Sequence, residues 1–382
     1  MLMPSDRTSL LDNVLAPIEV ARGLPNAHYI DEQTYIHERD TLFFGAWSAV
    51  GFAKDVPEEG DAKPIDFLGM PLLLVRNHAG DIRVFQNTCR HRGMILVEEA
   101  RKIKGPIRCP YHSWCYDFDG RLINTPHVGG SGIDSHDAIK KDELSLFEIR
   151  STVWRDIIFV NISGDAPDFL DATKELCARW QPFDLPLFHG GETNSFSFEV
   201  NCNWKLAVEN YCESYHLPWI HPSLNSYSRI EDHYHIDDGA NYAGQGTVVY
   251  QQIEGENGEK IPDFKGLPDK WDSHAEYVAL FPNVLLGIHR DHAFANILLP
   301  DGPERTIEHV ELYYSRGDLS QMGVGGLLDA NAKLWQTVFA EDVGVIEGMQ
   351  RGRHGVKFDG GKFSPAMDGP THAFHKWVAQ HL

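Results

Sequence analysis

The chain has 382 residues, 42% hydrophobic and 23% charged, as in an ordinary globular protein. It contains 34 Lys and Arg and 55 Asp and Glu. The resulting net charge of −21 argues against nucleic acid or an anionic membrane as a partner. No apolar run is long enough for a membrane span and no secretory signal is evident, so we expect a cytoplasmic protein. Six irregularly spaced Cys do not form a disulfide framework, which leaves free thiols or metal ligands.

The N-terminal third of the chain predicts a short helix followed by β-structure. Residues 31–46 have helical periodicity, and Asp31 is a suitable N-cap. Strand-like stretches follow at 47–53, 71–77 and 82–88, separated by turn signals. We therefore expect a small all-β domain after the helix.

Beyond residue 160 the pattern changes to a mixture of helices and longer strands. Helical periodicity marks 166–180, 201–217 and 330–352, whereas 246–253 and 294–300 read as strands. Runs of strands interrupted by separate helices are typical of an α+β domain with an antiparallel sheet.

Two Cys and two His of the β-rich region form an unusual pattern. Cys89 and His91 are two residues apart, and after a long gap Cys109 and His112 are three apart. Four such ligands also suit zinc, but a zinc finger usually places its Cys pair and its His pair on separate elements. Here each loop supplies one Cys and one His, which suits two metal atoms with different ligands. This is the ligand set of a Rieske [2Fe–2S] cluster, with two Cys on one iron and two His on the other.

A second constellation lies in the helical stretch 201–217. Glu209, Glu213 and His216 have helical spacings that place them on one face. Pro218 is expected to end the helix, so that His221 returns toward His216. Two His and one carboxylate around Fe(II) form the facial triad of oxygen-activating enzymes. Helix geometry alone allows either Glu209 or Glu213 as the carboxylate.

The sequence resembles the Rieske non-haem iron oxygenases over nearly its whole length. The segments "CRHRG" and "CPYHSWCYDFDGRL" are similar to the Rieske domain of ring-hydroxylating and related oxygenases. Respiratory Rieske proteins have an extra Cys in each ligand loop, where this chain has Met94 and Tyr111. The resemblance implies an α+β fold in which a small all-β Rieske domain accompanies a helix-grip catalytic domain with an antiparallel sheet. We expect 1–46 to be an N-terminal helical part of the catalytic domain, 47–160 the Rieske domain and 161–382 the catalytic domain.

The resemblance also assigns roles to single residues. It implies that Asp342 in "VFAEDVGVIEGMQRG" completes the iron site with His216 and His221. It implies that Glu213 bonds both His216 and His112 of a neighbouring subunit. Most of the family has Asp at this position. The Glu of this chain resembles the carnitine oxygenases, which also have Glu there. Asn210 and Tyr211 are expected to line the substrate pocket.

The family implies the oxygenase component of a multi-protein enzyme with a Rieske cluster and a mononuclear Fe(II). A separate NAD(P)H-dependent reductase supplies electrons, O2 is activated, and a small organic molecule is oxidised, with a homotrimer as the expected assembly. We favour a quaternary amine as substrate, oxidised by demethylation or C–N cleavage. The alternatives are hydroxylation of an aromatic ring and, outside the enzymes, an electron carrier or zinc protein.

Further residues have both a functional and a plain interpretation. The basic residues Arg101, Lys102, Lys104 and Arg108 form either a solvated turn or a docking site for an acidic electron donor. Trp204, Tyr211, Tyr215 and Trp219 form either hydrophobic core or a cage for a quaternary ammonium group. A metal site at His233 and His235 is possible, but an exposed loop is favoured. His372 and His375 are expected to be surface or packing residues.

Overall fold

The computed structural model describes residues 11–382, which divide into two compact units. One unit is Phe44–Ala166, and the other joins the described residues up to Phe43 with Pro167–Leu382. The units therefore meet at 43/44 and 166/167, whereas the sequence predicted domain boundaries at 46/47 and 160/161. Within residues 11–382, no helix combines the length and the apolar character that a membrane span requires.

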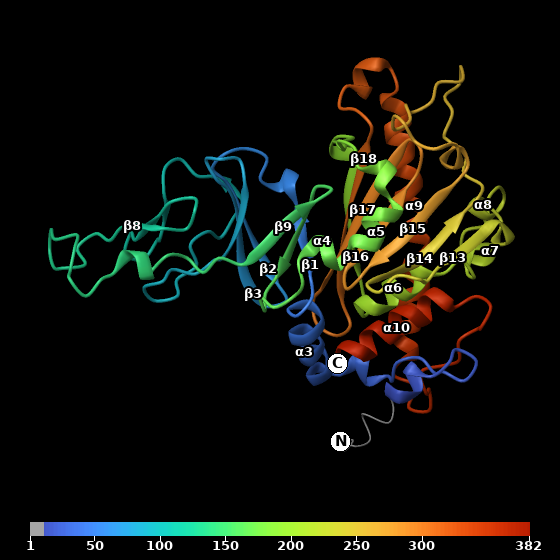
Figure 1. Cartoon of the computed structure of the whole chain (residues 1–382), viewed down its shortest axis with the longest axis horizontal. Helices are drawn as coiled ribbons and strands as arrows, with labels where there is room; N and C mark the ends of the chain where they lie inside the picture. Colours follow the sequence, from blue (N-terminus) through green and yellow to red (C-terminus); the bar gives the residue numbers. More distant parts are fainter. Residues whose placement is uncertain (1–10) are drawn as a thin grey trace. The chain divides into compact units, whose positions relative to one another are not determined.

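The unit Phe44–Ala166 consists of small antiparallel sheets (Figure 1). In spatial order the strands are β1 (Ser48–Phe52), β10 (Ile157–Asn161) and β9 (Arg150–Trp154); β4 (Ile82–Gln86), β3 (Met70–Arg76), β2 (Asp61–Phe67) and β5 (Arg101–Lys102); and β6 (Ile107–Arg108), β7 (Cys115–Tyr116) and β8 (Leu122–Asn124). Alternating apolar residues such as Leu73, Val75 and Phe85 point into one core, which also holds both Cys of the motif. The prediction of a small all-β domain is confirmed.

The larger unit is built around an eight-stranded antiparallel sheet (Figure 1). Its order is β11 (Phe188–His189), β18 (Thr306–Tyr314), β17 (His292–Pro300), β16 (Val284–Ile288), β15 (Ala275–Leu280), β14 (Tyr242–Thr247) and β13 (His233–Ile236), with β12 (Ser195–Val200) also paired to β18. Nearly every residue of β16 and β17 is buried, so both faces of the sheet centre are covered. The predicted α+β class with an antiparallel sheet is confirmed.

This unit also contains helices. They are α2 (Ala27–Ile30), α3 (Glu32–Glu38), a π-helical turn (Arg39–Phe43), α4 (Phe169–Ala172), α5 (Lys174–Arg179), α6 (Trp204–Cys212), α7 (Leu217–Ile220), α8 (Pro222–Asn225), α9 (Gly325–Gly352) and α10 (Gly369–His381). Among these helices, α6, α9 and α10 contact the sheet. The side chain of Asn203 caps α6 by accepting a hydrogen bond of 3.1 Å from the backbone N–H of Lys205. The predicted helix 201–217 is wrong at its end, because Glu213 is extended with φ −121° and ψ 161°.

Buried charges hold α6 in place. The Lys205 ammonium lies 2.5 Å from the Glu38 carboxylate, and their side chains are 0% and 1% exposed. One turn later, Glu209 lies 3.1 Å from His375 and 3.3 Å from Arg353. Burial by itself would raise the pKa of Glu209, but His375 and Arg353 outweigh it and lower the pKa to about 2. These pairs fix the helix that leads into the candidate iron site.

Replacing Lys205 with Met is expected to lower the free energy of unfolding by about 3–5 kcal/mol, because Glu38 stays buried without its Lys and with only the imidazole of His28, 2.7 Å away, beside it. Denaturant unfolding measures this change. Lys265→Met, at an exposed position, is the matched control and should stay within about 0.5 kcal/mol of the parent. Equal losses in the two variants would contradict a stabilising role of the buried pair.

Candidate metal centres and active-site pocket

The two Cys–His loops of the small unit close in the same way. The backbone N–H of Gly93 donates to the carbonyl of Cys89 at 2.9 Å, and that of Ser113 to the carbonyl of Cys109 at 3.0 Å. Gly93 and Ser113 both have positive φ, +70° and +57°. A left-handed residue at the same place in each loop turns the chain back, so that each loop presents one sulfur and one imidazole.

The thiols and the imidazoles of this site differ in their exposure to solvent. Cys89 and Cys109 are buried, 3% and 2% exposed, whereas His91 is exposed and His112 half-buried. The Nδ1 atoms of the two rings lie 3.2 Å apart. These residues would fit a cluster with two inner sulfur ligands and two outer imidazole ligands, which would supply single-electron transfer.

Neighbouring rings orient the proposed cluster ligands. His91 stacks on Trp114 with centroids 4.8 Å apart and an interplanar angle of 11°. The Tyr116 oxygen accepts from the backbone N–H of Arg90 at 3.0 Å, so its O–H is free to donate to Cys89 Sγ at 3.3 Å. Such a bond stabilises a sulfur that carries negative charge, as a cluster ligand does.

The second site forms where α6 ends. His216 precedes α7, His221 follows it, and Asp342 lies in α9. Asp342 Oδ1 lies 3.0 Å from His221 Nε2 and 3.7 Å from His216 Nε2, and the potential ligand atoms all lie within 4.8 Å of one another. This oxygen is buried, and no described residue donates a hydrogen bond to it. Two imidazole nitrogens and one carboxylate oxygen converging in this way fit a mononuclear Fe(II) with open positions.

Each imidazole of this site is held by a carboxylate on its other nitrogen. Glu213 Oε1 lies 2.6 Å from His216 Nδ1, and Glu341 Oε2 lies 2.7 Å from His221 Nδ1. A proton on each Nδ1 leaves each Nε2 as a metal-binding lone pair aimed at Asp342. Burial lowers the pKa of His221, but its contacts with Asp342 and Glu341 outweigh burial and raise the pKa.

The structure separates residues that the sequence left as alternatives. Glu209 is committed to the buried pairs with His375 and Arg353, and Glu213 bonds Nδ1 of His216. Neither fits as the triad carboxylate, whereas Asp342 does. The sequence did not predict a role for Glu341. The one feature that could have indicated it is its position next to Asp342.

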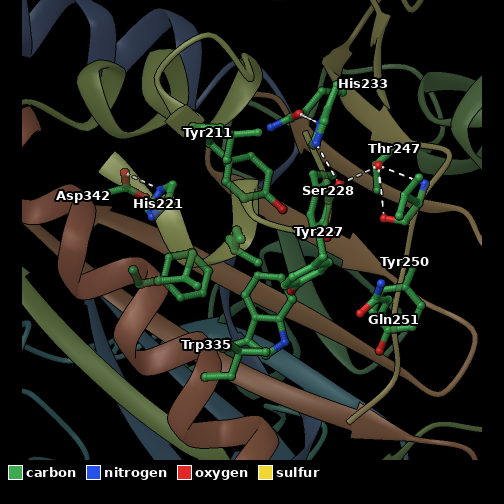
Figure 2. Close-up of a pocket in the computed structure, with 18 of the residues that line it drawn as sticks. Tyr211, His221, Tyr227, Ser228, His233, Thr247, Tyr250, Gln251, Trp335 and Asp342 are labelled. Carbon is green, nitrogen blue, oxygen red and sulfur yellow. Dashed lines mark hydrogen bonds and ion pairs between the residues drawn. The ribbon is translucent and has the colours of Figure 1, made fainter. Parts of the chain in front are cut away.

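A pocket with about 900 Å³ of space, including its open mouth, lies beside this triad (Figure 2). Asn210 and Tyr211 line it as predicted, and the Tyr211 hydroxyl donates to the Leu286 carbonyl at 2.8 Å. Its aromatic lining residues are Tyr211, Tyr227, Tyr250, Tyr277, Trp335 and Phe339. Its described lining includes the Asp342 carboxylate but no Lys or Arg.

Of the two interpretations given to four aromatic residues, hydrophobic core holds for Trp204, and a pocket wall holds for Tyr211 alone. Trp204 is fully buried in the core and packs edge-on against Phe43 at 4.9 Å. Tyr215 and Trp219 are 44% and 69% exposed and do not line the pocket. Of the four rings proposed, only Tyr211 faces it. The other pocket rings come from segments far apart in the sequence, which no local pattern connects.

The remaining histidines have ordinary partners. His233 and His235 lie in β13, so the expected exposed loop is wrong. His233 Nδ1 lies 2.6 Å from Gln245 Oε1, and no described metal-binding cluster includes either ring. His372 and His375 are buried residues of α10; packing fits His372, whereas His375 forms the ion pair with Glu209.

Comparison with known proteins shows the family of the chain. Residues 46–141 match the Rieske [2Fe-2S] domain, and residues 191–382, half of the chain, match the ring hydroxylating alpha subunit (catalytic domain). Choline monooxygenase of Arabidopsis thaliana, a chloroplastic protein, is 26% identical over 96% of this chain and 84% of that protein. The carnitine monooxygenase oxygenase subunit of Acinetobacter pittii is 24% identical over 90% of this chain and 88% of that protein.

Solved structures share the fold at lower identity. A quaternary ammonium Rieske monooxygenase, CntA, superposes with a TM-score of 0.75 at 21% identity, covering 100% of this chain and 99% of that one. Naphthalene 1,2-dioxygenase from Rhodococcus sp. gives 0.79 at 18% identity with the same coverage. The chain therefore belongs to the Rieske-type non-haem iron oxygenases, as an oxygenase alpha subunit with a Rieske [2Fe–2S] domain and a mononuclear-iron catalytic domain.

Proposed function

We propose that this chain is the terminal oxygenase of a system that oxidises a quaternary amine by demethylation or C–N cleavage. The observation that carries the proposal is the pocket beside His221 and Asp342, whose described lining has six Tyr, Trp and Phe rings and no Lys or Arg. Aromatic faces bind ammonium groups without competing for them as a positive side chain would. The relatives named choline and carnitine monooxygenase support the same substrate class.

The proposed roles of the residues follow from their contacts. A Rieske cluster supplies single electrons and a mononuclear Fe(II) supplies O2 activation when the two sites are loaded. Cys89, His91, Cys109 and His112 hold the first site, and His216, His221 and Asp342 the second. Asn210 and Tyr211 limit where a substrate lies relative to the iron.

Glu213 is proposed to connect the two sites across a subunit boundary. Glu213 Oε1 bonds His216 Nδ1 and Oε2 accepts from the backbone N–H groups of Tyr215 and His216, but the side chain is half-buried, and we propose that His112 of a neighbouring subunit reaches its exposed part. This arrangement requires an oligomer, and the family resemblance favours a homotrimer. Electrons come from a separate NAD(P)H-dependent reductase, and we place the system in the cytoplasm.

The reductase is proposed to dock beside the cluster loops. Arg101, Lys104 and Arg108 are exposed there, but Lys102 pairs with Glu58 and contributes less free charge. Reversing the charge at Lys104 and Arg108 together should slow reduction about tenfold at low salt and weaken its salt dependence, because steering by opposite charge is lost. Stopped-flow bleaching of the cluster measures the rate. Lys265→Glu, in the other unit, is the control, and unchanged salt dependence in the double variant would contradict docking here.

The substrate proposal is tested by NAD(P)H-dependent oxygen uptake with the cognate reductase. The panel contains choline, carnitine, glycine betaine and aromatic acids, and products are identified by mass spectrometry. We expect turnover of at least one quaternary amine, with an aldehyde or a demethylated amine as product. Turnover of aromatic acids alone would contradict the proposal.

Aromatic-ring hydroxylation is the second candidate. It is favoured by the aliphatic part of the lining, which includes Leu217, Leu224 and Val338, and which suits an uncharged ring. The fold likeness to naphthalene 1,2-dioxygenase is compatible with it. Ring hydroxylation in the same panel, with quaternary amines inert, would establish this alternative.

A further inference from the structure

A buried carboxylate lies behind the pocket wall, separate from the iron ligands. Asp291 is 1% exposed and accepts hydrogen bonds from the Tyr250 hydroxyl at 2.8 Å and from Gln252 Nε2 at 3.3 Å. Its Oδ1 also lies 2.8 Å from Nδ1 of His292, which lines the pocket. Nothing in the proposed reaction at the iron uses this group.

The hydrogen bonds from this carboxylate lead to an aromatic face of the pocket. The indole N–H of Trp335 donates to His292 Nε2 at 2.8 Å, so that nitrogen carries no proton. His292 is therefore neutral, with its proton on Nδ1 and donated to Asp291. The chain from Asp291 through His292 to Trp335 thus carries a full negative charge that the imidazole does not cancel. All three residues are buried, at 1%, 1% and 6% exposure.

Such a chain strengthens the binding of a cation. Each hydrogen bond polarises the next in a low-dielectric interior, so the carboxylate draws on the indole N–H and enriches the ring in electron density. Indole is the best aromatic partner for a cation, and desolvation increases the interaction. Figure 2 shows Trp335 facing the same space as Tyr227.

The described lining of the same pocket offers no Lys or Arg as an ionic partner for a substrate carboxylate. Nearby Arg290 bonds Asp263 and Asp272 instead of facing the pocket. Burying an unpaired carboxylate is costly, and Asp291 adds like-charge repulsion. The neutral polar groups of the pocket include Ser228 and Thr247, which bond each other at 2.8 Å and suit a hydroxyl (Figure 2).

We propose that the substrate is an ammonium cation that bears no carboxylate, and that Asp291, acting through His292 and Trp335, selects it. The inference rests on the proposed quaternary-amine function and narrows it to choline-like molecules over zwitterions such as carnitine and glycine betaine. Asp291 is a positioning and specificity residue, not a catalytic one, because it does not line the pocket.

Isothermal titration of the oxidised holoenzyme tests this selection with matched probes. Choline is compared with 3,3-dimethylbutan-1-ol, its uncharged isostere, and with glycine betaine and L-carnitine. We expect choline to bind about tenfold or more tightly than the isostere and the zwitterions. Asp291→Asn should abolish most of the preference over the isostere, whereas the exposed Asp272→Asn should keep it. Trp335→Phe, which keeps a ring but removes the N–H, should reduce the preference in part.

The outcomes separate the inference from the proposed function. Tighter binding and faster turnover of a zwitterion would overturn the inference while quaternary-amine oxidation stands. Equal binding of choline and its isostere, or a preference unchanged in both Asp291→Asn and Trp335→Phe, would also overturn it. Turnover of aromatic substrates alone would remove the proposed function itself. If Asp291→Asn does not fold, the Trp335→Phe comparison decides between the outcomes.

Discussion

Replacing Asp342 with Ala should remove the mononuclear iron and leave the Rieske cluster in place. Asp342 supplies the only carboxylate oxygen that converges with His216 and His221 among the described residues. Two neutral imidazoles alone hold Fe(II) weakly, so iron should fall from about three to about two atoms per chain. Metal analysis with the visible spectrum measures this, and turnover should fall at least about a hundredfold.

A control on the same helix keeps this prediction specific. Asp329 also lies in α9 but is exposed, and it accepts a hydrogen bond from Thr193. Asp329→Ala should keep the full iron content and activity. If Asp342→Ala retained its third iron, the assignment of the triad carboxylate would be wrong.

Replacing Glu213 with Gln should slow product formation about a hundredfold in a single turnover while most of the catalytic iron stays bound. The amide oxygen still accepts from His216 Nδ1, so the ring stays oriented, but the negative charge and the acceptor for the backbone N–H groups of Tyr215 and His216 are lost. If Glu213 connects this ring to a neighbouring subunit, the charge matters for transfer between sites more than for metal binding. Rapid quench of the pre-reduced enzyme with one equivalent of O2 measures the step.

Glu341 provides the matched comparison. It makes the same kind of bond to His221 that Glu213 makes to His216. Glu341→Gln should therefore alter iron affinity to a similar extent but leave the single-turnover rate of the loaded enzyme within about threefold. Identical rate losses in the two variants would argue that Glu213 only supports the metal.

The metal motifs were predictable because their geometry is local. Cys89 and His91, like Cys109 and His112, lie in one tight loop each, and such short loops leave few ways to aim the two side chains. The iron triad was harder to predict from the sequence. His221 and Asp342 are 121 residues apart in the sequence, and only the packing of α9 brings them together. Asp342 came from the family resemblance, not from spacing.

The predicted closeness of Glu213 to His216 is confirmed, but the predicted cause, a single helix that contains both residues, is wrong. Periodicity predicted one helix through His216, yet Glu213 Oε2 accepts from the backbone N–H of His216 at 3.2 Å and from that of Tyr215. These local side-chain bonds replace helical ones and end α6 at Cys212. The turn then brings the ring of His216 onto the Glu213 carboxylate.

The pocket could not be predicted, because its walls come from separate elements. Tyr277 lies in β15, His292 begins β17 and Trp335 lies in α9. Each reads in the sequence as an ordinary core residue, and only tertiary packing turns their polar atoms toward one another. No sequence pattern singles out Asp291, because its proposed role depends on its contact with the imidazole of His292.

The central claim is that one chain holds two separate iron sites. Iron and acid-labile sulfide should be measured per chain in the parent and in the His216→Ala/His221→Ala variant, together with turnover. We predict about three iron and two sulfide in the parent, and about two of each in the variant, with its visible spectrum intact and its turnover lost. Equal iron in both proteins, or turnover that persists in the variant, would contradict the account.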